Sequence, residues 1–221
     1  MTDRRRVLFL VGFAVYFILL WLFWNSPVVY PVRVFVVFLH EISHGAAAVA
    51  TGGSIQRITL NPRLGGACYC PGGNAFLTLS AGYLGSLVWG GLLLEVGRKA
   101  GRRAHAITRG VGGAVIILTL LFVRGGFGIA FGLLFGGFLL LVSDRIGAEA
   151  NRTLLAVLGL TSVLYAILDI KSDVLDRPHL PSDAHMLAQL TGVPTVAWGV
   201  LWIGIAVLVA SWLLVRAFRD A

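Results

Sequence analysis

The apolar stretch Val32–Ala50 (VRVFVVFLHEISHGAAAVA) carries two histidines and a glutamate near its end, His40-Glu41-Ile42-Ser43-His44. On an α-helix, positions four apart lie on one face, so His40 and His44 would stand one turn apart. Two imidazoles at that spacing can bind one zinc ion, and Glu41 beside them can act as a base. Ionisable groups at membrane depth are costly, so this H-E-x-x-H pattern is the first candidate for a functional site.

The composition indicates a polytopic membrane protein. Of 221 residues, 57% are hydrophobic and 13% are Asp, Glu, Lys or Arg, and the mean hydropathy is +0.87. A soluble domain carries about twice that share of charge. The net charge of +8 comes from basic residues between the apolar runs. It favours contact with anionic lipid headgroups over nucleic acid, because the sequence offers no basic, aromatic-interleaved domain outside the membrane.

Seven apolar runs are candidates to cross the bilayer. They are Val7–Trp24, Val32–Ala50, Phe76–Val96, Val111–Val123, Phe127–Val142, Thr153–Ile170 and Val196–Val215. Between the second and third runs, Ile55–Leu60 and Gly66–Cys70 predict a small β-hairpin across the turn Asn61–Gly65. We therefore expect an all-α polytopic membrane protein of about seven transmembrane helices with a small β-hairpin, folded as a single membrane-embedded domain over residues 1–221. The two cysteines, Cys68 and Cys70, are expected to be small buried residues.

A catalytic zinc takes three protein ligands, so a third must come from elsewhere in the chain. The candidates are Asp169, Asp173, His179, Asp183 and His185. Asp169 is favoured because it stands inside an apolar run, where a lone carboxylate needs a cation. Asp173, one turn on and nearer water, is the alternative. Asp183 follows Ser182 before a short predicted helix, Ala184–Leu190, which is more typical of a cap or first-turn acid than of a ligand.

The direction of the chain also favours Asp169. The second and sixth runs cross the membrane in the same direction, and His44 lies about 10 Å from the end of the second run at 1.5 Å per residue. Because Asp169 stands near the end of the sixth run, both residues approach the same face. This arrangement requires the region Val111–Val142 to cross the membrane twice.

Together these features resemble the site-2 protease family of intramembrane zinc metallopeptidases, and more narrowly its compact branch without a PDZ domain. The resemblance covers about Val32 to Trp202. It rests on the H-E-x-x-H helix, the glycine-rich β segment, Ser80–Ser86, Leu168-Asp169-Ile170 and Ser182-Asp183-Ala184. It implies zinc held by His40, His44 and Asp169, with Glu41 as the catalytic base, and a catalytic core of about residues 32–96 and 153–202.

The resemblance further implies a transmembrane protein as substrate, the lipid bilayer as surroundings, and partner subunits in the membrane as an option. It places the metal near the cytoplasmic face of the plasma membrane. Substrate contacts are expected at Ile55, Ile58, Gly82 and Ser86. Two positions depart from the family pattern. Ile170 stands where the family has the glycine of Leu-Asp-Gly. The stretch Ser80–Ser86 replaces the family's Gly-Pro-x-x-Asn, so the asparagine is absent and Ser86 is the residue nearest to its position in the sequence.

Because of these departures, a proteolytically inactive scaffold or subunit that binds partner helices stays open as an alternative. A transporter is a third class, but it would need further polar residues at the membrane midplane, and the apolar runs offer few. Metal content separates a plain helical bundle from the other interpretations, and a cleavage assay separates an enzyme from a scaffold.

Overall fold

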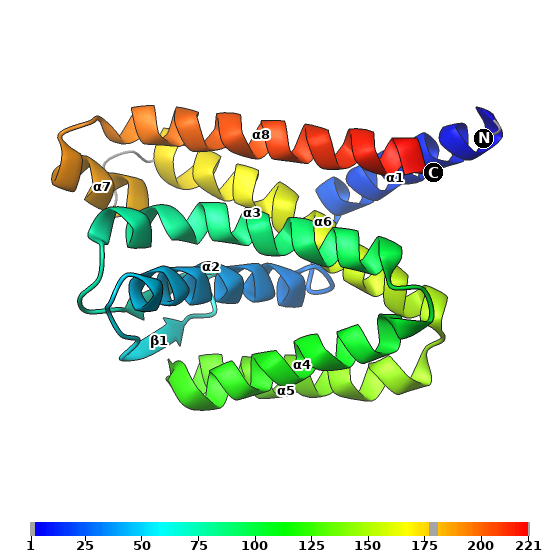
Figure 1. The fold of residues 1–221 in the computed structure, drawn as a ribbon, viewed down its shortest axis with the longest axis horizontal. Coiled ribbons are helices and arrows are strands. Elements are labelled where there is room, and N and C mark those ends of the chain that lie inside the picture. Colours follow the sequence, from blue (N-terminus) through cyan, green and yellow to red (C-terminus); the bar gives the residue numbers. More distant parts are fainter. Residues whose placement is uncertain (1–2, 177–180, 221) are drawn as a thin grey trace.

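Most of the long helices run along one axis, and a small sheet lies near one end (Figure 1). The computed structural model describes residues 3–176 and 181–220. The helices are α1 (Asp3–Leu22), α2 (Tyr30–Ala50), α3 (Ala75–Lys99), α4 (Ala104–Phe122), α5 (Gly126–Arg145), α6 (Ala148–Ile170), α7 (Asp183–Thr191) and α8 (Thr195–Asp220). The strands are β1 (Arg57–Leu60), β2 (Gly66–Tyr69) and β3 (Val123–Arg124). A 3₁₀ turn, η1 (Gly101–Arg103), precedes α4, and a π-helical turn, η2 (Lys171–Asp176), follows α6.

The chain is an integral membrane protein, as its composition predicted. Helices α2, α3, α5, α6, α8 and α4 with its preceding turn are long and apolar enough to span a membrane, and α1 adds the shorter apolar segment Val11–Leu22. Large apolar side chains point outward, including Leu134 and Leu208, which expose 74% and 72% of their surface. Such residues face lipid without cost. The seven predicted apolar runs correspond to α1–α6 and α8, so the expected fold class is confirmed.

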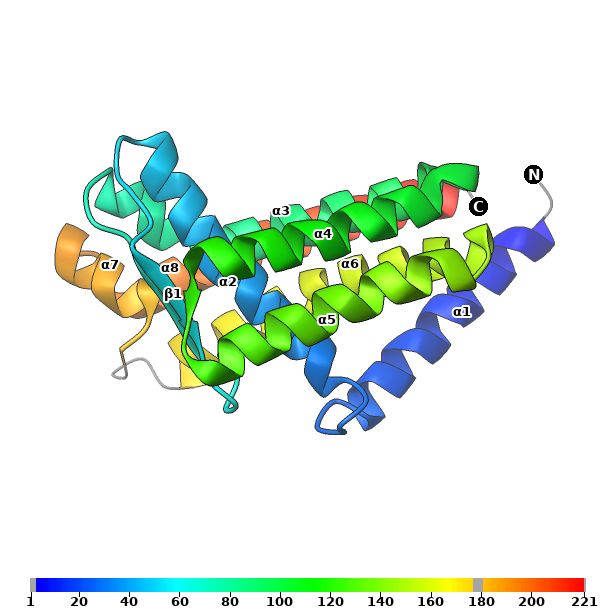
Figure 2. The ribbon, with the colours of Figure 1, turned by 90° about the horizontal axis from the view of Figure 1, so that it is seen from below.

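Helix α2 is the most deeply buried of the candidate spans. Pro31 lies in its first turn, where a missing N–H leaves no helical hydrogen bond unmade. Val34, Phe35 and Phe38 are almost fully buried in the main core cluster, which also contains Phe135 of α5. Figure 2 shows α2 running obliquely to α4 and α5. The H-E-x-x-H helix is therefore held on several sides by other elements.

The predicted hairpin is present, and the structure adds a third strand to it. β1 pairs antiparallel with β2, with Ile58 opposite Cys68, and parallel with β3, with Ile58 opposite Val123. β3 is a two-residue strand in the α4–α5 connection, too short to produce a sequence pattern. Gly125 follows it at φ +92°, a conformation that favours glycine. The sheet order β2-β1-β3 leaves β2 at one edge.

Helices α4 and α5 form an antiparallel hairpin, so the region Val111–Val142 runs along the bundle twice, as two crossings require (Figure 1). As a result, α2 and α6 both end on the side of the molecule where the sheet and α7 lie. The chain termini lie at the opposite end. This arrangement brings the end of the H-E-x-x-H helix and the end of α6 close together.

Close glycine contacts hold α3 against α6. A methyl group added at Gly159 would lie 2.4 Å from the main-chain nitrogen of Leu94, so the two backbones would have to separate. We expect Gly159→Ala to destabilise the fold by about 1–3 kcal/mol through overpacking. Gly137→Ala is the control, because a methyl group there meets no neighbour within 4 Å. Thermal unfolding in detergent measures both variants, and an unchanged midpoint for Gly159→Ala would contradict this packing.

Candidate metal centre

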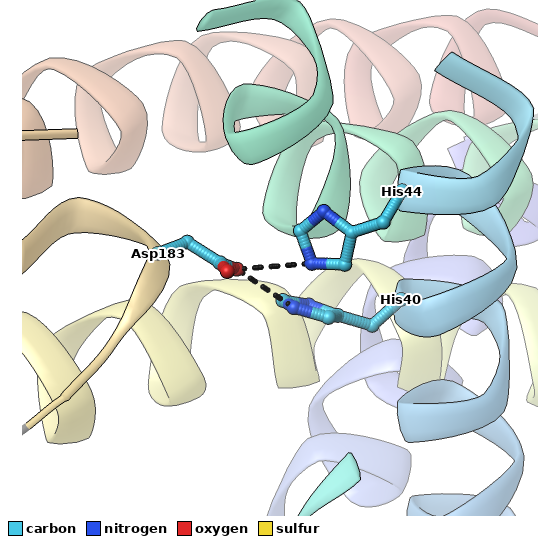
Figure 3. Close-up of side chains that lie close together, drawn as sticks. All are labelled: His40, His44 and Asp183. Atoms are coloured by element: carbon cyan, nitrogen blue, oxygen red, sulfur yellow. Dashed lines mark hydrogen bonds and ion pairs between the residues drawn. The ribbon is translucent and has the colours of Figure 1, made fainter. Parts of the chain in front are cut away.

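Three potential metal ligands converge at the sheet end of the molecule (Figure 3). One carboxylate oxygen of Asp183 lies 2.9 Å from Nε2 of His40 and 3.2 Å from Nε2 of His44. The ligand atoms of the three residues all lie within 4.8 Å of one another. The side chains expose 14% (His40), 8% (His44) and 12% (Asp183) of their surface. The cluster therefore joins α2 to α7 across a separation of about 140 residues in sequence.

The position of Asp183 follows from how α7 begins and packs. Ser182 caps the helix, since its hydroxyl accepts a hydrogen bond from the main-chain N–H of His185. Ala184 and Leu187 are fully buried against Tyr83 of α3 and Trp202 of α8. With α7 held in this way, its first residue, Asp183, points toward α2. Burial raises the pKa of Asp183, but the adjacent His44 and His40 outweigh burial and hold that pKa well below its usual value.

The orientation of His44 is fixed from α3. Its Nδ1 lies 2.7 Å from the main-chain oxygen of Thr78, so Nδ1 carries the hydrogen and donates it to that carbonyl. Nε2 then presents its lone pair toward Asp183 unless the ring is protonated. A lone pair and a carboxylate oxygen repel each other at 3.2 Å without a proton or a cation between them. The donor arrangement is thus of the kind in which a carbonyl orients a metal-binding imidazole.

Glu41 lies beside this cluster with 5% of its surface exposed. The main chain of Cys68 in β2 lies beside its carboxylate. The approach of β2 is close because residue 66 is glycine: a methyl group there would lie 2.5 Å from Oε1 of Glu41. Strand β2 therefore packs directly against the carboxylate of Glu41.

All four residues line one cavity of about 720 Å³. Its walls come from α2, the start of α3, the loop and strand at residues 64–68, and the start of α7. Asp169 near the end of α6 also lines this cavity. The histidines, Glu41 and the edge strand β2 therefore all line the same cavity.

The structure places Asp183, rather than the expected Asp169, beside the two histidines. Asp169 lies on the cavity wall outside the close group, and Asp183 occupies the position next to both histidines. Asp183 is also the first-turn acid that the sequence predicted, since it begins α7. The two roles are compatible, because a residue at a helix start can point away from its own helix. The side chain of Asp173 and the whole of His179 lie outside the described part of the chain, and His185 faces Gln189.

The four expected substrate contacts lie in different surroundings. Ile58 is fully buried in the main core, and Ile55 packs on Gly45 of α2. The Ser86 hydroxyl is buried and donates to the main-chain oxygen of Gly82. Gly82 itself faces the histidines. Of these four, Gly82 is the residue that the structure brings to the metal-ligand cluster.

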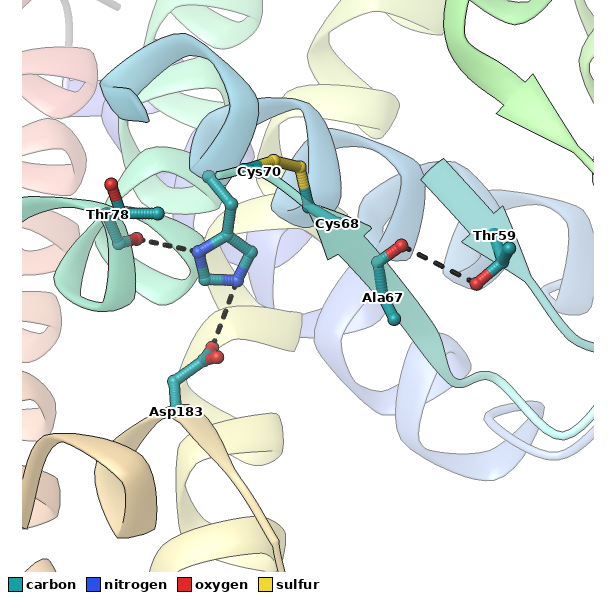
Figure 4. The surroundings of a disulfide bond; sticks show 7 residues. Thr59, Ala67, Cys68, Cys70, Thr78 and Asp183 are labelled. Atoms are coloured by element: carbon teal, nitrogen blue, oxygen red, sulfur yellow. Dashed lines mark hydrogen bonds and ion pairs between the residues drawn. A yellow bond between two sulfur atoms is a disulfide. The ribbon is translucent and has the colours of Figure 1, made fainter. Parts of the chain in front are cut away.

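The two cysteines form a disulfide rather than standing as separate buried residues (Figure 4). Both sulfur-bearing residues are partly exposed and line the same cavity as Glu41. Cys68 belongs to β2 and Cys70 follows it, so the bond lies at the end of the edge strand. The disulfide therefore closes a short loop beside the candidate site.

Two histidines one helical turn apart, a facing carboxylate and an adjacent glutamate are the residues of a metallopeptidase-type site, here within a membrane protein. A family model described as Peptidase M50B-like matches residues 13–213. The chain belongs to this family, within the site-2 protease group that the sequence resembles. No curated protein and no solved structure matches the chain.

Gly82 controls the space between the imidazoles and α3. A methyl group there would lie 2.4 Å from Nε2 of His40 and 2.5 Å from Nε2 of His44. We expect Gly82→Ala to displace both rings and to lower zinc bound by the purified protein at least tenfold. Gly91→Ala on the same helix is the control, since its nearest neighbour lies at 3.4 Å. Equal zinc in the two variants would show that the space beside Gly82 is not needed for the metal.

Proposed function

We propose that the protein is a zinc-dependent intramembrane metallopeptidase that hydrolyses peptide bonds in or near transmembrane segments of other membrane proteins. The convergence of His40, His44 and Asp183 beside Glu41 is the observation that carries this proposal. Membership in the Peptidase M50B-like family supports it independently.

The residues at the site fit zinc. Two imidazole nitrogens and one carboxylate oxygen are the ligand set of many catalytic zinc sites, and they leave a fourth position open. Ligands bound at about 2.0–2.1 Å in a tetrahedron lie roughly 3.3 Å from one another. The observed spacings of 2.9 and 3.2 Å from Asp183 to His40 and His44 are close to that value. We therefore assign the third ligand to Asp183, with Asp169 on the cavity wall.

The chemistry divides between the metal and Glu41. Zinc, when bound, supplies the Lewis acidity that activates water and polarises a scissile carbonyl. The Glu41 carboxylate takes a proton from the attacking water and gives it to the departing amine nitrogen. Strand β2 packs against that carboxylate at Gly66 and limits the positions it can take. His44 keeps its orientation through the carbonyl of Thr78.

Strand β2 offers a place to hold the substrate. A peptide bond inside a helix is hydrogen-bonded and shielded, so the substrate must unwind locally before attack. β2 is an edge strand, and its residues Gly66, Ala67 and Cys68 line the cavity. An unwound segment can add to this edge by main-chain hydrogen bonds, which places its carbonyls beside Glu41. β1 cannot serve in this way because both its edges are paired.

The expected catalytic core, about residues 32–96 and 153–202, contains every element that supplies the site: α2, β2, α3, α6 and α7. The remaining described helices, α1, α4, α5 and most of α8, surround these elements. We propose that the core performs the reaction and that the outer helices face lipid, the substrate or partner subunits.

The orientation that places the site near the cytoplasmic face of the plasma membrane stays a prediction of the family resemblance. The basic residues bear on it. At the end away from the site lie Arg98, Lys99, Arg102, Arg103, Arg109, Arg145, Arg152, Arg216 and Arg219, whereas Arg57, Arg63, Arg124 and Lys171 lie near the site. The positive-inside rule assigns the more basic end to the cytoplasm. These charges therefore favour the opposite orientation.

Replacing the proposed base tests the function. Glu41→Gln keeps the size of the side chain but cannot accept the proton, so we expect cleavage to fall by about 10²–10⁴-fold. The assay uses liposomes that contain the protein and a single-span reporter with glycine and proline in its span. Glu149→Gln, at an exposed position away from the site, is the matched control. Zinc content should be equal in all three proteins.

Full cleavage by Glu41→Gln would remove Glu41 from the mechanism. No cleavage by the wild type of any reporter, together with stoichiometric zinc, would instead support the inactive scaffold. The two failures are distinguishable because the wild type cleaves the reporter in the first case and does not in the second.

A further inference from the structure

A second large cavity, of about 840 Å³, opens on the lipid side of the bundle at the end away from the metal centre. Helices α1, α3, α6 and α8 form its walls. The wall residues are mostly small or apolar and include Gly12, Ala156, Leu160, Ala210 and Leu214. Small residues make the groove by leaving space between helices. In a bilayer such a groove is in contact with hydrocarbon chains.

One end of this groove is basic. Arg98, Lys99 and Arg152 line it. The carboxylate of Glu95 lies 2.8 Å from Arg98, 3.2 Å from Lys99 and 3.6 Å from Arg216. One carboxylate thus pairs with three cations, so the group formed by these four described side chains carries a net positive charge. The excess charge lies where the apolar walls begin.

Hydrogen bonds and an ion pair hold the side chain of Arg152 in place at this end of the groove. Its guanidinium group donates to the main-chain oxygens of Gly97 and Arg98, which end helix α3, and pairs with Glu149 at 2.7 Å. Its position is set by the fold rather than by a flexible side chain alone. Lys99 exposes 59% of its side chain and Arg216 exposes 39%, so both can reach a group at the groove mouth.

The length of the groove indicates the kind of ligand. Along α6 the lining runs from Arg152 to Leu164, which is about 18 Å at 1.5 Å per residue. Half of a hydrocarbon core of about 30 Å is about 15 Å. The groove therefore has the depth of one leaflet, whereas a transmembrane helix would need a groove across the whole membrane. Beside its deeper part, Tyr16 and Thr161 hydrogen-bond to each other at 2.6 Å and need no polar ligand.

We propose that this groove is a binding site for an anionic phospholipid. Its phosphate lies at the basic group formed by Arg98, Lys99, Arg152 and Arg216, and its acyl chains lie along the apolar walls. The lipid would join α1 to α3, α6 and α8. Free phosphate would leave the walls uncovered, and a zwitterionic lipid would not match the excess charge.

Lipid binding to the purified full-length chain in detergent tests this site by native mass spectrometry. The probes are phosphatidylglycerol, phosphatidylcholine with the same acyl chains, and inorganic phosphate. We expect phosphatidylglycerol to bind at least tenfold more tightly than either of the others. The double variant Lys99→Gln/Arg216→Gln should weaken it about tenfold, since each basic residue contributes a fewfold factor. Arg63→Gln/Lys171→Gln removes the same charge near the metal centre and should bind as the wild type does.

Filling the groove is the second arm. Ala210→Phe should abolish phosphatidylglycerol binding and leave the basic residues in place, and its thermal unfolding shows whether it folds. Equal affinity for the two lipids, or unchanged binding by both the double variant and a folded Ala210→Phe, would overturn the proposal. Phosphate binding as tight as that of phosphatidylglycerol would also overturn it, because it would mean an anion site without a lipid.

Discussion

The need to satisfy two imidazoles and two carboxylates inside an apolar bundle governs this structure. Ionisable groups at membrane depth require partners. His40 and His44 lie beside the carboxylate of Asp183, and Glu41 packs against strand β2 at Gly66. These contacts explain why a short helix, α7, and a small sheet are placed against a helix that would otherwise be a simple apolar span. The buried polar groups thus determine where the irregular parts of the fold lie.

Much of this arrangement could be predicted from the sequence. Apolar runs identify the spans because a helix that crosses the hydrocarbon core must be apolar over its length. Two histidines at positions i and i+4 lie on one face of a helix by geometry alone. The hairpin was visible through its alternation and its turn residues. These features are local, so neighbouring residues are enough to define them.

The remaining features depend on contacts between distant segments. β3 has two residues, and it forms because the α4–α5 turn is brought against β1. Asp183 lies about 140 residues from the histidines, and it reaches them because Ala184 and Leu187 pack against α3 and α8. Its position after Ser182 correctly predicted a helix start. The same local signal does not show that Asp183 lies beside the histidines, and Asp169, which the apolar surroundings favoured as a ligand, lines the same cavity.

The two ends of the bundle differ in chemistry. The candidate metal centre, Glu41, Asp169 and the strand edge gather at one end, and the basic groove mouth lies at the other. Glycines allow the helices between these ends to pack closely, as at Gly90 and Gly159.

The third ligand is tested most directly by the zinc content of purified wild type, Asp183→Ala and Asp169→Ala, measured by elemental analysis after thermal unfolding has shown that each is folded. We predict one zinc per chain in the wild type and in Asp169→Ala, and loss of most of the zinc in Asp183→Ala. Zinc retained by Asp183→Ala and lost from Asp169→Ala would contradict the assignment of the third ligand, and a wild type without zinc would contradict the metal centre itself.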